Sequence, residues 1–321
     1  MKEKILITGG AGYIGSQISY CLSDLGYETV IVDNLSTGNK KLINPNSIFY
    51  NLDILNTKKI SKIIKSYNIK TIFHMAASLS VEESMRNEKK YYINNVEGTK
   101  SLLEGANKNI ENFIFSSTCA VYGNSKNSKV KEISRINPNS VYGKTKYLSE
   151  LLITKYSKKN NFKTAIIRYF NVAGSDPKLR SGCINKNDQL IKNLVSRYKK
   201  KKYSIDVYGG DYKTKDGTCV RDYIHVYDLA RIHIESMNYL INNKKSLLMN
   251  CGYGKGYSVL EVIKTFEKIS NKKFSISFKN KREGDVSEII SDNSYFKKKL
   301  KIKYKNKLED ILKSSLNWEL K

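Results

Sequence analysis

Short apolar runs alternate with stretches of helical spacing through the first half of the chain. Residues Ile5 to Thr8 form an apolar run of β-favouring residues, with the length of a buried parallel strand. Apolar residues then recur at helical spacing from Ile14 to Leu25. We predict further strands at Thr29–Val32, Ile48–Leu52, Thr71–Met75, Phe113–Ser116 and Ile166–Phe170, and helices over 57–67 and 88–107. This alternation is typical of an α/β protein whose parallel sheet is wound on both sides.

The pattern changes after Phe170. Residues 175–190 are polar and irregular, which indicates a passage into a second lobe. Beyond it we predict a strand and turn over 206–212, a strand over 219–226, a helix over 227–240, a strand over 247–252, an exposed charged loop over 281–285 and a helix from about 307. The sequence therefore predicts two domains, residues 1–172 and a smaller α/β domain over 173–321, with some later segments returning to the first.

Three glycines follow the first strand at three-residue spacing and open the first helix. Gly9 allows a tight turn, Gly12 lets phosphates approach the backbone, and Gly15 lets helix and strand pack closely. The backbone N–H groups of a helix N-terminus suit a pyrophosphate. Because such a triplet also occurs in plain turns, its surroundings decide between the two interpretations.

Acidic and small residues at the following strand ends favour the nucleotide interpretation. Asp33 ends the second strand, eighteen residues after Gly15, where this kind of fold keeps an acid for the ribose hydroxyls. A carboxylate there would repel a 2′-phosphate, so we expect NAD rather than NADP. Asp53 could meet the adenine amino group, and Ala76 and Ala77 would let a cofactor lie close. The sequence thus predicts a Rossmann-type sheet that binds NAD.

Composition excludes several other classes of protein. The 321 residues are 40% hydrophobic, enough for a substantial core, and no apolar run has the length of a membrane span. No secretion signal is recognisable at the start, so we expect a cytoplasmic protein. The five cysteines are dispersed without a Cys-x-x-Cys pair, which indicates reduced thiols. The three histidines are far apart and predict no metal site.

The net charge of +27 and the pI of about 9.6 raise the question of nucleic-acid binding. However, lysines are spread along the whole chain, and the clusters at 199–202 and 297–299 resemble solvated helix ends. We therefore expect no nucleic-acid partner. The charge would still attract an anionic nucleotide substrate.

A second chemical pattern follows the strand at Phe113–Ser116. Thr118 lies just beyond that strand, and further along Tyr142 and Lys146 are four residues apart, so they share one face of a helix. Such a Tyr-x-x-x-Lys pair is common by chance in a chain rich in both residues. Its place downstream of the glycine turn, at the start of an amphipathic helix, favours a functional pair.

Taken together, these blocks resemble the extended short-chain dehydrogenase/reductase family, and within it the UDP-glucose 4-epimerases, over nearly the full length. The resemblance rests on Thr8–Ser16, Asp33–Leu35, Phe113–Ser117, Tyr142 with Lys146, Arg168–Asn171, Asp216–Thr218, Arg221–Val226 and Arg282–Asp285. It implies an NAD-binding first domain, a UDP-sugar-binding second domain, and inversion at C4 of a UDP-hexose such as UDP-galactose. It also implies a homodimer joined through the helix over 88–107 and the helix that follows Tyr142.

The resemblance further implies roles for individual residues. Catalytic roles fall on Tyr142, Lys146 and Thr118. Cofactor contacts fall on Gly9, Gly12, Tyr13, Ile14, Gly15, Asp33, Asn34, Asp53, Ile54, Met75, Ala76, Ala77, Asn94, Tyr142, Lys146 and Phe170. Substrate contacts fall on Thr118, Asn171, Gln189, Leu190, Tyr208, Arg221, Arg282 and Asp285.

The family reaction would use Tyr142 as the base for the sugar 4-hydroxyl, with Thr118 hydrogen-bonded to the sugar oxygen. An ordinary tyrosine has a pKa near ~10, so this role requires a pKa about three units lower. We expect Lys146 and the positive nicotinamide ring to lower it.

Some positions depart from the family pattern and leave alternatives open. Gln189 and Lys192 stand where Asn and Pro are common, Met75 replaces a usual Phe, and Ile289 occupies the position that helps set sugar size. Epimerisation of a UDP-N-acetylhexosamine, UDP-uronic acid or UDP-pentose therefore stays open, as does a non-catalytic NAD-binding sensor. Cys119, followed by Ala120, replaces the Asp-Glu pair of the related dehydratases, which argues against loss of water.

Overall fold

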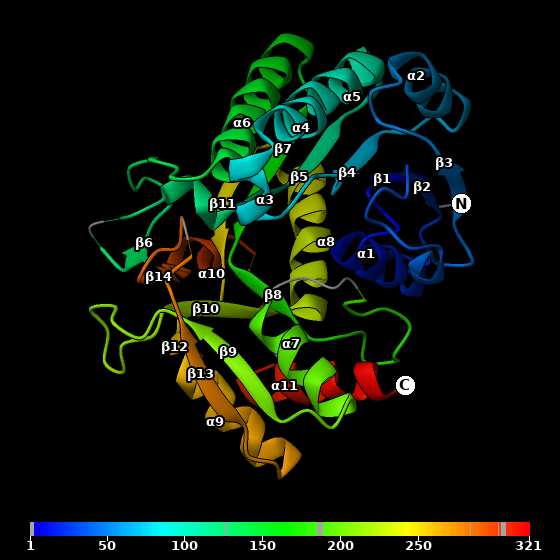
Figure 1. Ribbon diagram of the computed structural model, residues 1–321. Coiled ribbons are helices and arrows are strands. Elements are labelled where there is room, and N and C mark those ends of the chain that lie inside the picture. Colours follow the sequence, from blue (N-terminus) through cyan, green and yellow to red (C-terminus); the bar gives the residue numbers. More distant parts are fainter. Residues whose placement is uncertain (1–2, 126, 185–188, 283, 301, 303–305) are drawn as a thin grey trace.

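A seven-stranded sheet organises the upper lobe of the computed structural model in Figure 1. The structure describes residues 3–125, 127–184, 189–282, 284–300, 302 and 306–321, so part of the predicted polar passage, 185–188, lies outside the described residues. The strands pair in parallel in the order β11-β7-β5-β4-β1-β2-β3. Their bounds are β1 Ile5–Thr8, β2 Thr29–Asp33, β3 Ile48–Asn51, β4 Thr71–His74, β5 Asn112–Thr118, β7 Lys163–Tyr169 and β11 Leu247–Cys251.

Helices cover both faces of this sheet. Alternate strand residues point to opposite faces, so Ile7 joins one apolar cluster and Leu6 the other. The first cluster packs under α1 (Tyr13–Asp24) and α8 (Val226–Asn243), and the second under α2 (Thr57–Ser66), α5 (Gly98–Ala106) and α6 (Val141–Asn160). The predicted α/β, doubly wound parallel sheet is confirmed.

The strand order reverses at β1. The chain proceeds from β1 through β2 to β3 on one side, and then returns to place β4 and β5 on the other side. In such a sheet the crevice outside the carboxyl ends of the two strands at the reversal is the usual ligand site. The glycine turn follows β1, and the small residues Ala76 and Ala77 lie just after β4, so both border this crevice.

Within the described residues, the lower lobe contains two small sheets and three helices. One sheet has the order β12-β10-β14-β6 with β8 beside β10, and the other pairs β9 with β13. The strand bounds are β6 Lys129–Val130, β8 Asn171–Ala173, β9 Ser204–Tyr208, β10 Val220–His225, β12 Gly256–Ser258, β13 Ser275–Lys279 and β14 Glu288–Ser291. The helices α7 (Leu190–Lys199), α9 (Val259–Ser270) and α11 (Leu308–Leu320) share an apolar cluster beneath these strands.

The two lobes are interleaved along the chain. The strand β6 belongs to the first half of the sequence but pairs with β14 of the lower lobe. Conversely, α8, β11 and α10 (Ser294–Leu300) follow the crossing at residue 173 yet pack into the upper lobe. Neither lobe is therefore one continuous stretch of chain.

The helix predicted over 88–107 contains a wider turn in its middle. It consists of α4 (Glu88–Tyr91), a π-helical segment (Tyr92–Glu97) and α5. In this wider turn Asn95 exchanges hydrogen bonds with the backbone of Ser78, and Asn94 reaches the cleft. Short or polar elements escaped prediction, including α3 (Val81–Arg86), which is capped by Ser80.

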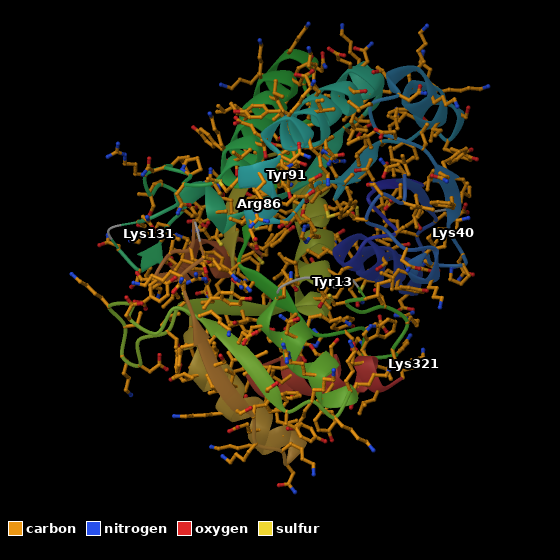
Figure 2. All side chains as sticks on the ribbon, viewed as in Figure 1. Tyr13, Lys40, Arg86, Tyr91, Lys131 and Lys321 are labelled. Carbon is orange, nitrogen blue, oxygen red and sulfur yellow. The ribbon has the colours of Figure 1, made fainter. Side chains whose placement is uncertain are left out.

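Charged side chains surround the molecule. Nitrogen-tipped side chains project on all sides of the outline in Figure 2, where Lys40, Lys131 and Lys321 lie far from one another. This distribution agrees with a compositional origin of the charge. No helix in the described part of the chain is both long and apolar enough to cross a bilayer. Within those residues, no group of three or more His, Cys, Asp or Glu side chains could hold a metal.

All three histidines are buried, and this predicts sensitivity to acid. Burial lowers the pKa of His74 to about 3 and of His225 and His233 to about 4. Between pH 6.5 and about 4 the unfolded chain therefore binds protons that the folded protein does not. The free energy of unfolding should fall over this window by up to about 1.4 kcal/mol per pH unit for each histidine.

Urea unfolding at pH 7, 6 and 5 measures this slope. His233→Gln is a suitable comparison, because it keeps a donor for the Leu229 carbonyl but cannot titrate. We expect it to reduce the slope by about a third. A free energy of unfolding that does not change between pH 7 and 5 would contradict the prediction.

Candidate active site

A cleft of about 400 Å³ opens at the strand reversal, between the two lobes. Its wall is built from the ends of β1, β2, β4, β5 and β7 above, and from segments of the lower lobe opposite. Most of the residues predicted for the site lie on this wall. They are Gly9, Gly12, Tyr13, Ile14, Gly15, Asp33, Asn34, Ile54, Met75, Ala76, Ala77, Asn94, Thr118, Tyr142, Phe170, Asn171, Gln189, Leu190, Arg221 and Asp285.

The glycine turn has the shape that a pyrophosphate requires. A Cβ on Gly9, whose φ is +72°, would lie 2.5 Å from the Ala76 nitrogen, and one on Gly15 would lie 2.2 Å from the Gly9 oxygen. Both positions therefore admit only glycine. Gly12 is different, because its nearest atom is the Gly9 oxygen at 3.2 Å and it borders the cleft. Its open side and the N-terminus of α1 form a cradle for phosphates.

The adenosine end of this cradle is defined by Asp33. Its carboxylate accepts hydrogen bonds from the backbone N–H groups of Ala11 (3.0 Å) and Leu35 (2.8 Å), which fix it at the cleft wall. Burial raises the pKa of Asp33 despite these bonds. Asp53 is not on the cleft wall described. Its carboxylate accepts a hydrogen bond from the side-chain amide of Asn34 at 2.8 Å, and Asn34 does lie on the wall. The glycines and Asp33 together fit a dinucleotide without a 2′-phosphate.

Tyr142 lies on the cleft wall in the first turn of α6. The helix is capped by Ser140, and the Tyr142 backbone N–H donates to the Ser84 hydroxyl. A Cβ on Gly143 would lie 2.6 Å from the Ala120 oxygen, so the helix rests directly on the segment after β5. This packing brings the Tyr142 side chain within hydrogen-bond reach of the Thr118 hydroxyl.

The pKa of Tyr142 in the protein without NAD differs from the lowered value that we predict for the cofactor-bound state. Burial raises the pKa of Tyr142 well above its usual range, Tyr169 adds to this, and the hydrogen bond with Thr118 only partly opposes it. The reason is that desolvation of a fully buried phenol outweighs a nearby hydroxyl.

Lys146 lies behind the wall rather than on it. Its side chain is 1% exposed, and its ammonium group lies 4.4 Å from the centre of the Phe115 ring. Burial lowers the pKa of Lys146 to about 7, although Glu150 acts in the opposite direction. Near neutral pH, protonated and neutral forms of Lys146 therefore coexist in the protein alone.

A buried ion pair supports the strands and the helix that carry these residues. Glu150 of α6 accepts from both Nε (2.9 Å) and Nη2 (2.5 Å) of Arg168 on β7, and from the Ser117 hydroxyl. Arg168 also donates to the Tyr122 hydroxyl, which donates in turn to Asn250 on β11. The network therefore joins β5, α6, β7 and β11 directly behind Thr118.

The lower lobe contributes a polar wall opposite the glycine turn. Arg221 of β10 lies on it, and its guanidinium group is 3.4 Å from the Asp285 carboxylate. Arg282 and Tyr208, which were predicted to contact substrate, are not on the wall described. The Arg282 guanidinium group instead lies 3.8 Å from the centre of the Tyr208 ring.

The sequence was then compared with families and proteins already known. The model of the NAD dependent epimerase/dehydratase family matches residues 5–252. The chain belongs to this family. The family predicted from the motif blocks is therefore confirmed.

Curated relatives and solved structures of this family extend the match over the whole chain. A UDP-glucose 4-epimerase from Azospirillum brasilense is 34% identical, covering 98% of this chain and 92% of that protein. The crystal structure of UDP-glucose 4-epimerase from Bifidobacterium longum in complex with NAD⁺ and UDP is 31% identical, with a TM-score of 0.92 and 98% of each chain covered. The UDP-Glc/GlcNAc 4-epimerase of Campylobacter jejuni is 38% identical, with a TM-score of 0.84 and 99% of each chain covered.

The structure shows the surroundings of two residues that depart from the family pattern, Lys192 and Ile289. Lys192, in the first turn of α7, donates to the Cys183 carbonyl (3.0 Å) and pairs with Glu319 of α11 (2.6 Å). An ion pair between two helices therefore replaces the proline. Ile289 is 4% exposed within an apolar cluster that includes Phe170, and it is not on the cleft wall described.

Several cleft residues of this epimerase-family site escaped prediction. Cys183 and Tyr223 face the cleft from the lower lobe, and Leu79 faces it from the segment after β4. Cys183 lies in a stretch without periodicity, so no local signal marked it. Tyr223 had a detectable signal, since it belongs to a predicted strand two residues after Arg221 and so points to the same face of that strand.

Proposed function

We propose that this protein interconverts UDP-galactose and UDP-glucose by inversion at C4, through a 4-keto sugar and with NAD held throughout. One observation carries the proposal. Tyr142 and the neighbouring Thr118 lie on the wall of the same cleft as the phosphate cradle of the glycine turn. A tyrosine that can exchange a proton, a hydroxyl group beside it and a dinucleotide cradle in one cleft fit a hydride-transfer reaction.

Different residues of the cleft would hold different parts of NAD. Gly12 and the N-terminus of α1 would hold the pyrophosphate, and Asp33 would hold the adenosine ribose. When bound, NAD supplies the hydride acceptor and a positive charge that favours the phenolate form of Tyr142. Because the reaction returns the hydride to the sugar, the cofactor is never consumed.

Tyr142 would exchange a proton with the sugar 4-hydroxyl. Thr118 would orient that oxygen through its hydroxyl group, which already contacts Tyr142. Without ligand the raised pKa keeps the proton on Tyr142, so the base forms only in the loaded enzyme. Tyr142 would therefore become a base only after NAD and the UDP-sugar have both bound.

The UDP part of the substrate would lie against the lower lobe. Arg221 offers a guanidinium fork to the diphosphate, in exchange for its contact with Asp285. Asn171 and Gln189 offer amide groups to the remaining polar atoms. Arg282 would have to leave the Tyr208 ring to join them.

The alternatives differ in what the cleft can hold. Arg221 is the only cationic side chain on the part of the wall that the structure describes, so a uronate carboxylate would compete with the diphosphate for it. For loss of water, Cys119 offers a thiol whose pKa burial raises to about 12, in place of an acid. A non-catalytic NAD-binding sensor would have no need of Tyr142 and Thr118 side by side on the cleft wall.

A UDP-N-acetylhexosamine is the second candidate substrate. One relative is named as a UDP-Glc/GlcNAc 4-epimerase, and Ile289 is not on the described wall, so its side chain does not narrow the cleft there.

We further propose a cytoplasmic homodimer. None of the five cysteines, all within the described residues, forms a disulfide, which suits a reducing compartment. Ile93 of the π-helical segment and Leu151 of α6 are 40% and 50% exposed, and their helices pack against each other. Two copies could bury these residues by joining the same helices. The molar mass from light scattering tests this assembly.

Product analysis tests the proposed function. Purified protein is incubated with UDP-galactose or, separately, UDP-N-acetylgalactosamine, with no NAD added, and the products are resolved by chromatography. We expect UDP-glucose from the first reaction, which requires retained cofactor. Conversion of both substrates would extend the activity to N-acetylhexosamines. No conversion of either, even with added NAD, would refute the proposal for these sugars.

A further inference from the structure

The chain passes from the upper to the lower lobe through a small closed loop, residues 175–182, here called the crossing hairpin. Ser175 and Gly182 form an antiparallel bridge at its base, and the Asp176 N–H donates to the Ser181 carbonyl at 2.8 Å. Leu179 at the tip has a φ of +52°, a left-handed conformation that a leucine keeps only when its surroundings fix it. The surroundings that fix the hairpin come from both ends of the chain.

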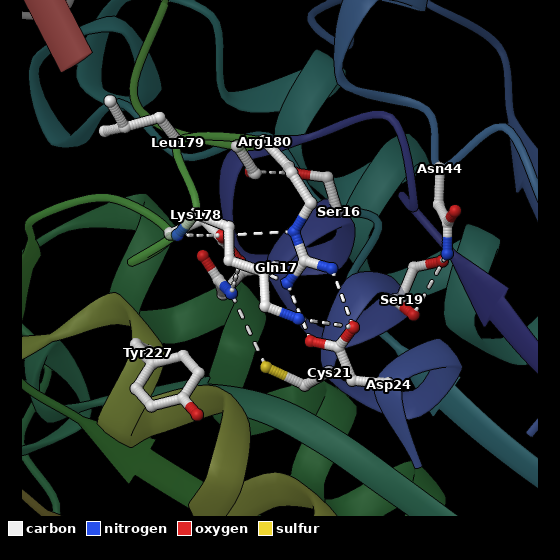
Figure 3. A network of polar contacts seen from close by, with 12 residues as sticks. Ser16, Gln17, Ser19, Cys21, Asp24, Asn44, Lys178, Leu179, Arg180 and Tyr227 are labelled. Carbon is white, nitrogen blue, oxygen red and sulfur yellow. Dashed lines mark hydrogen bonds and ion pairs between the residues drawn. The ribbon is translucent and has the colours of Figure 1, made fainter. Parts of the chain in front are cut away.

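The first helix holds one side of the crossing hairpin along its whole length. One stripe of α1 side chains, at spacings of three and four residues, faces it. The contacts are Tyr13 Oη to the Gly174 carbonyl (2.6 Å), Ser16 Oγ with Ser181 Oγ (2.6 Å), Gln17 Nε2 to Asp176 Oδ2 (2.8 Å), and Asp24 from both Nη atoms of Arg180 (2.8 Å each). They run from the glycine turn to the last turn of the helix. Figure 3 shows the part of this stripe from Ser16 and Gln17 to Asp24, with Arg180 facing it.

Arg180 is the centre of this attachment. It donates to both oxygens of Asp24 and also to Asp176, through Nε (3.1 Å) and Nη2 (2.8 Å), while its guanidinium group lies 4.7 Å from the centre of the Tyr20 ring. Asp176 is completely buried, so its charge depends on Arg180 and Gln17. Lys178 also pairs with Asp24, but through one contact of 3.3 Å, and its side chain is 67% exposed.

The last helix holds the other side. The Gly174 N–H donates to the Ser315 hydroxyl at 3.0 Å, and the Ser175 hydroxyl donates to the Ser314 carbonyl at 2.8 Å. Trp318 of α11 lies against Gly182, where a Cβ would come within 2.5 Å of its ring. The crossing hairpin is therefore clamped between α1 and α11.

Both ends of the hairpin open onto the cleft. Ala173 before it and Cys183 after it are wall residues, and Tyr13, which holds the Gly174 carbonyl, belongs to the glycine turn itself. The wall that faces the glycine turn is thus attached to α1 through the crossing hairpin. Opening of this wall would therefore require the contacts between the hairpin and α1 to break.

We propose that the crossing hairpin is a latch that retains the dinucleotide, with Arg180 as the positioning residue that keeps it closed. The inference rests on the proposed function for the identity of the nucleotide, NAD. It explains how a cofactor that is regenerated in each cycle stays in place between cycles. Arg180 is outside the cleft wall described and acts only through the hairpin.

The test measures how fast NAD leaves. Wild type and variants are loaded with NAD, and the released nucleotide is trapped by an excess of an NAD-hydrolysing enzyme. Arg180→Gln removes the guanidinium group that joins Asp24 and Asp176. Asp24→Asn removes the negative charge on α1 with which Arg180 pairs. Lys178→Gln is the matched control, because it removes the same charge from the same partner. Thermal unfolding is recorded separately, since a merely structural role would lower the Tm without changing release well below it.

We expect Arg180→Gln and Asp24→Asn to release NAD about tenfold faster or more, and Lys178→Gln to stay within about twofold of wild type. If folded Arg180→Gln releases NAD at the wild-type rate, the latch is overturned. It is also overturned if Lys178→Gln accelerates NAD release as much as Arg180→Gln does. Should Arg180→Gln not fold, a wild-type rate for Asp24→Asn overturns it. These results leave the product assay unaffected, whereas a wild type that takes up no NAD would overturn both the latch and the proposed function.

Discussion

Tyr142→Phe should lower kcat by about a thousandfold while leaving the fold and the bound NAD intact. The phenol is buried on the cleft wall, so phenylalanine keeps its packing and removes only the hydroxyl group. That oxygen is the proton acceptor of the proposed reaction and the partner of Thr118. The variant is assayed for conversion of UDP-galactose, and its nucleotide content is measured after denaturation.

The matched control is Tyr147→Phe. Tyr147 lies on the same helix, is half-buried and packs against an apolar cluster, but it is not itself on the cleft wall described. It should retain nearly full activity. Near-normal turnover by Tyr142→Phe would remove Tyr142 from the mechanism, and loss of activity together with loss of NAD would point to a structural role instead.

Arg168→Ala should lower the free energy of unfolding by about 3–5 kcal/mol. The side chains of Arg168 and Glu150 are only 4% and 5% exposed, and removal of the arginine leaves the carboxylate buried without its cation. Tyr122 loses a donor at the same time. Urea unfolding monitored by circular dichroism gives the free energy directly.

An exposed pair provides the comparison for this measurement. Arg86 pairs with Glu82 at 2.7 Å on α3, but the two side chains are 79% and 48% exposed. Arg86→Ala should therefore change the free energy of unfolding by less than about 1 kcal/mol. Equal effects of the two substitutions would show that burial of the Arg168 pair has no energetic consequence. Replacement of both Arg168 and Glu150 by apolar residues should recover part of the loss, because no unpaired charge remains.

Local patterns were sufficient for the cofactor half of the site. Asp33 ends a strand of clear apolar character and Gly9 and Ala76 follow two others, and the carboxyl ends of parallel strands meet at one edge of the sheet. Their proximity therefore follows from periodicity alone. Thr118 and Tyr142 were predictable for a related reason, since one follows a strand and the other opens a helix.

The positions of other site residues depend on packing between segments far apart in the sequence, which periodicity cannot predict. The contact of Lys146 with the cofactor stays a prediction, and periodicity did not indicate that its ammonium group lies against the Phe115 ring. Cys183 depends on the crossing hairpin, whose contacts join residues more than a hundred positions apart. One omission was avoidable, because Ser258 and Glu261 form a capping box that marked the start of α9.

The interleaving of the lobes has a consequence for biosynthesis. A nascent chain that has reached residue 172 carries the glycine turn and six strands of the large sheet, but the outer edge of β7 still lacks β11, which ends at Cys251. An unpaired edge of this kind can pair with other chains. About eighty more residues must leave the ribosome before β11 covers that edge. The nucleotide-binding sheet is therefore completed only after β8, α7, β9 and β10 of the lower lobe have been made.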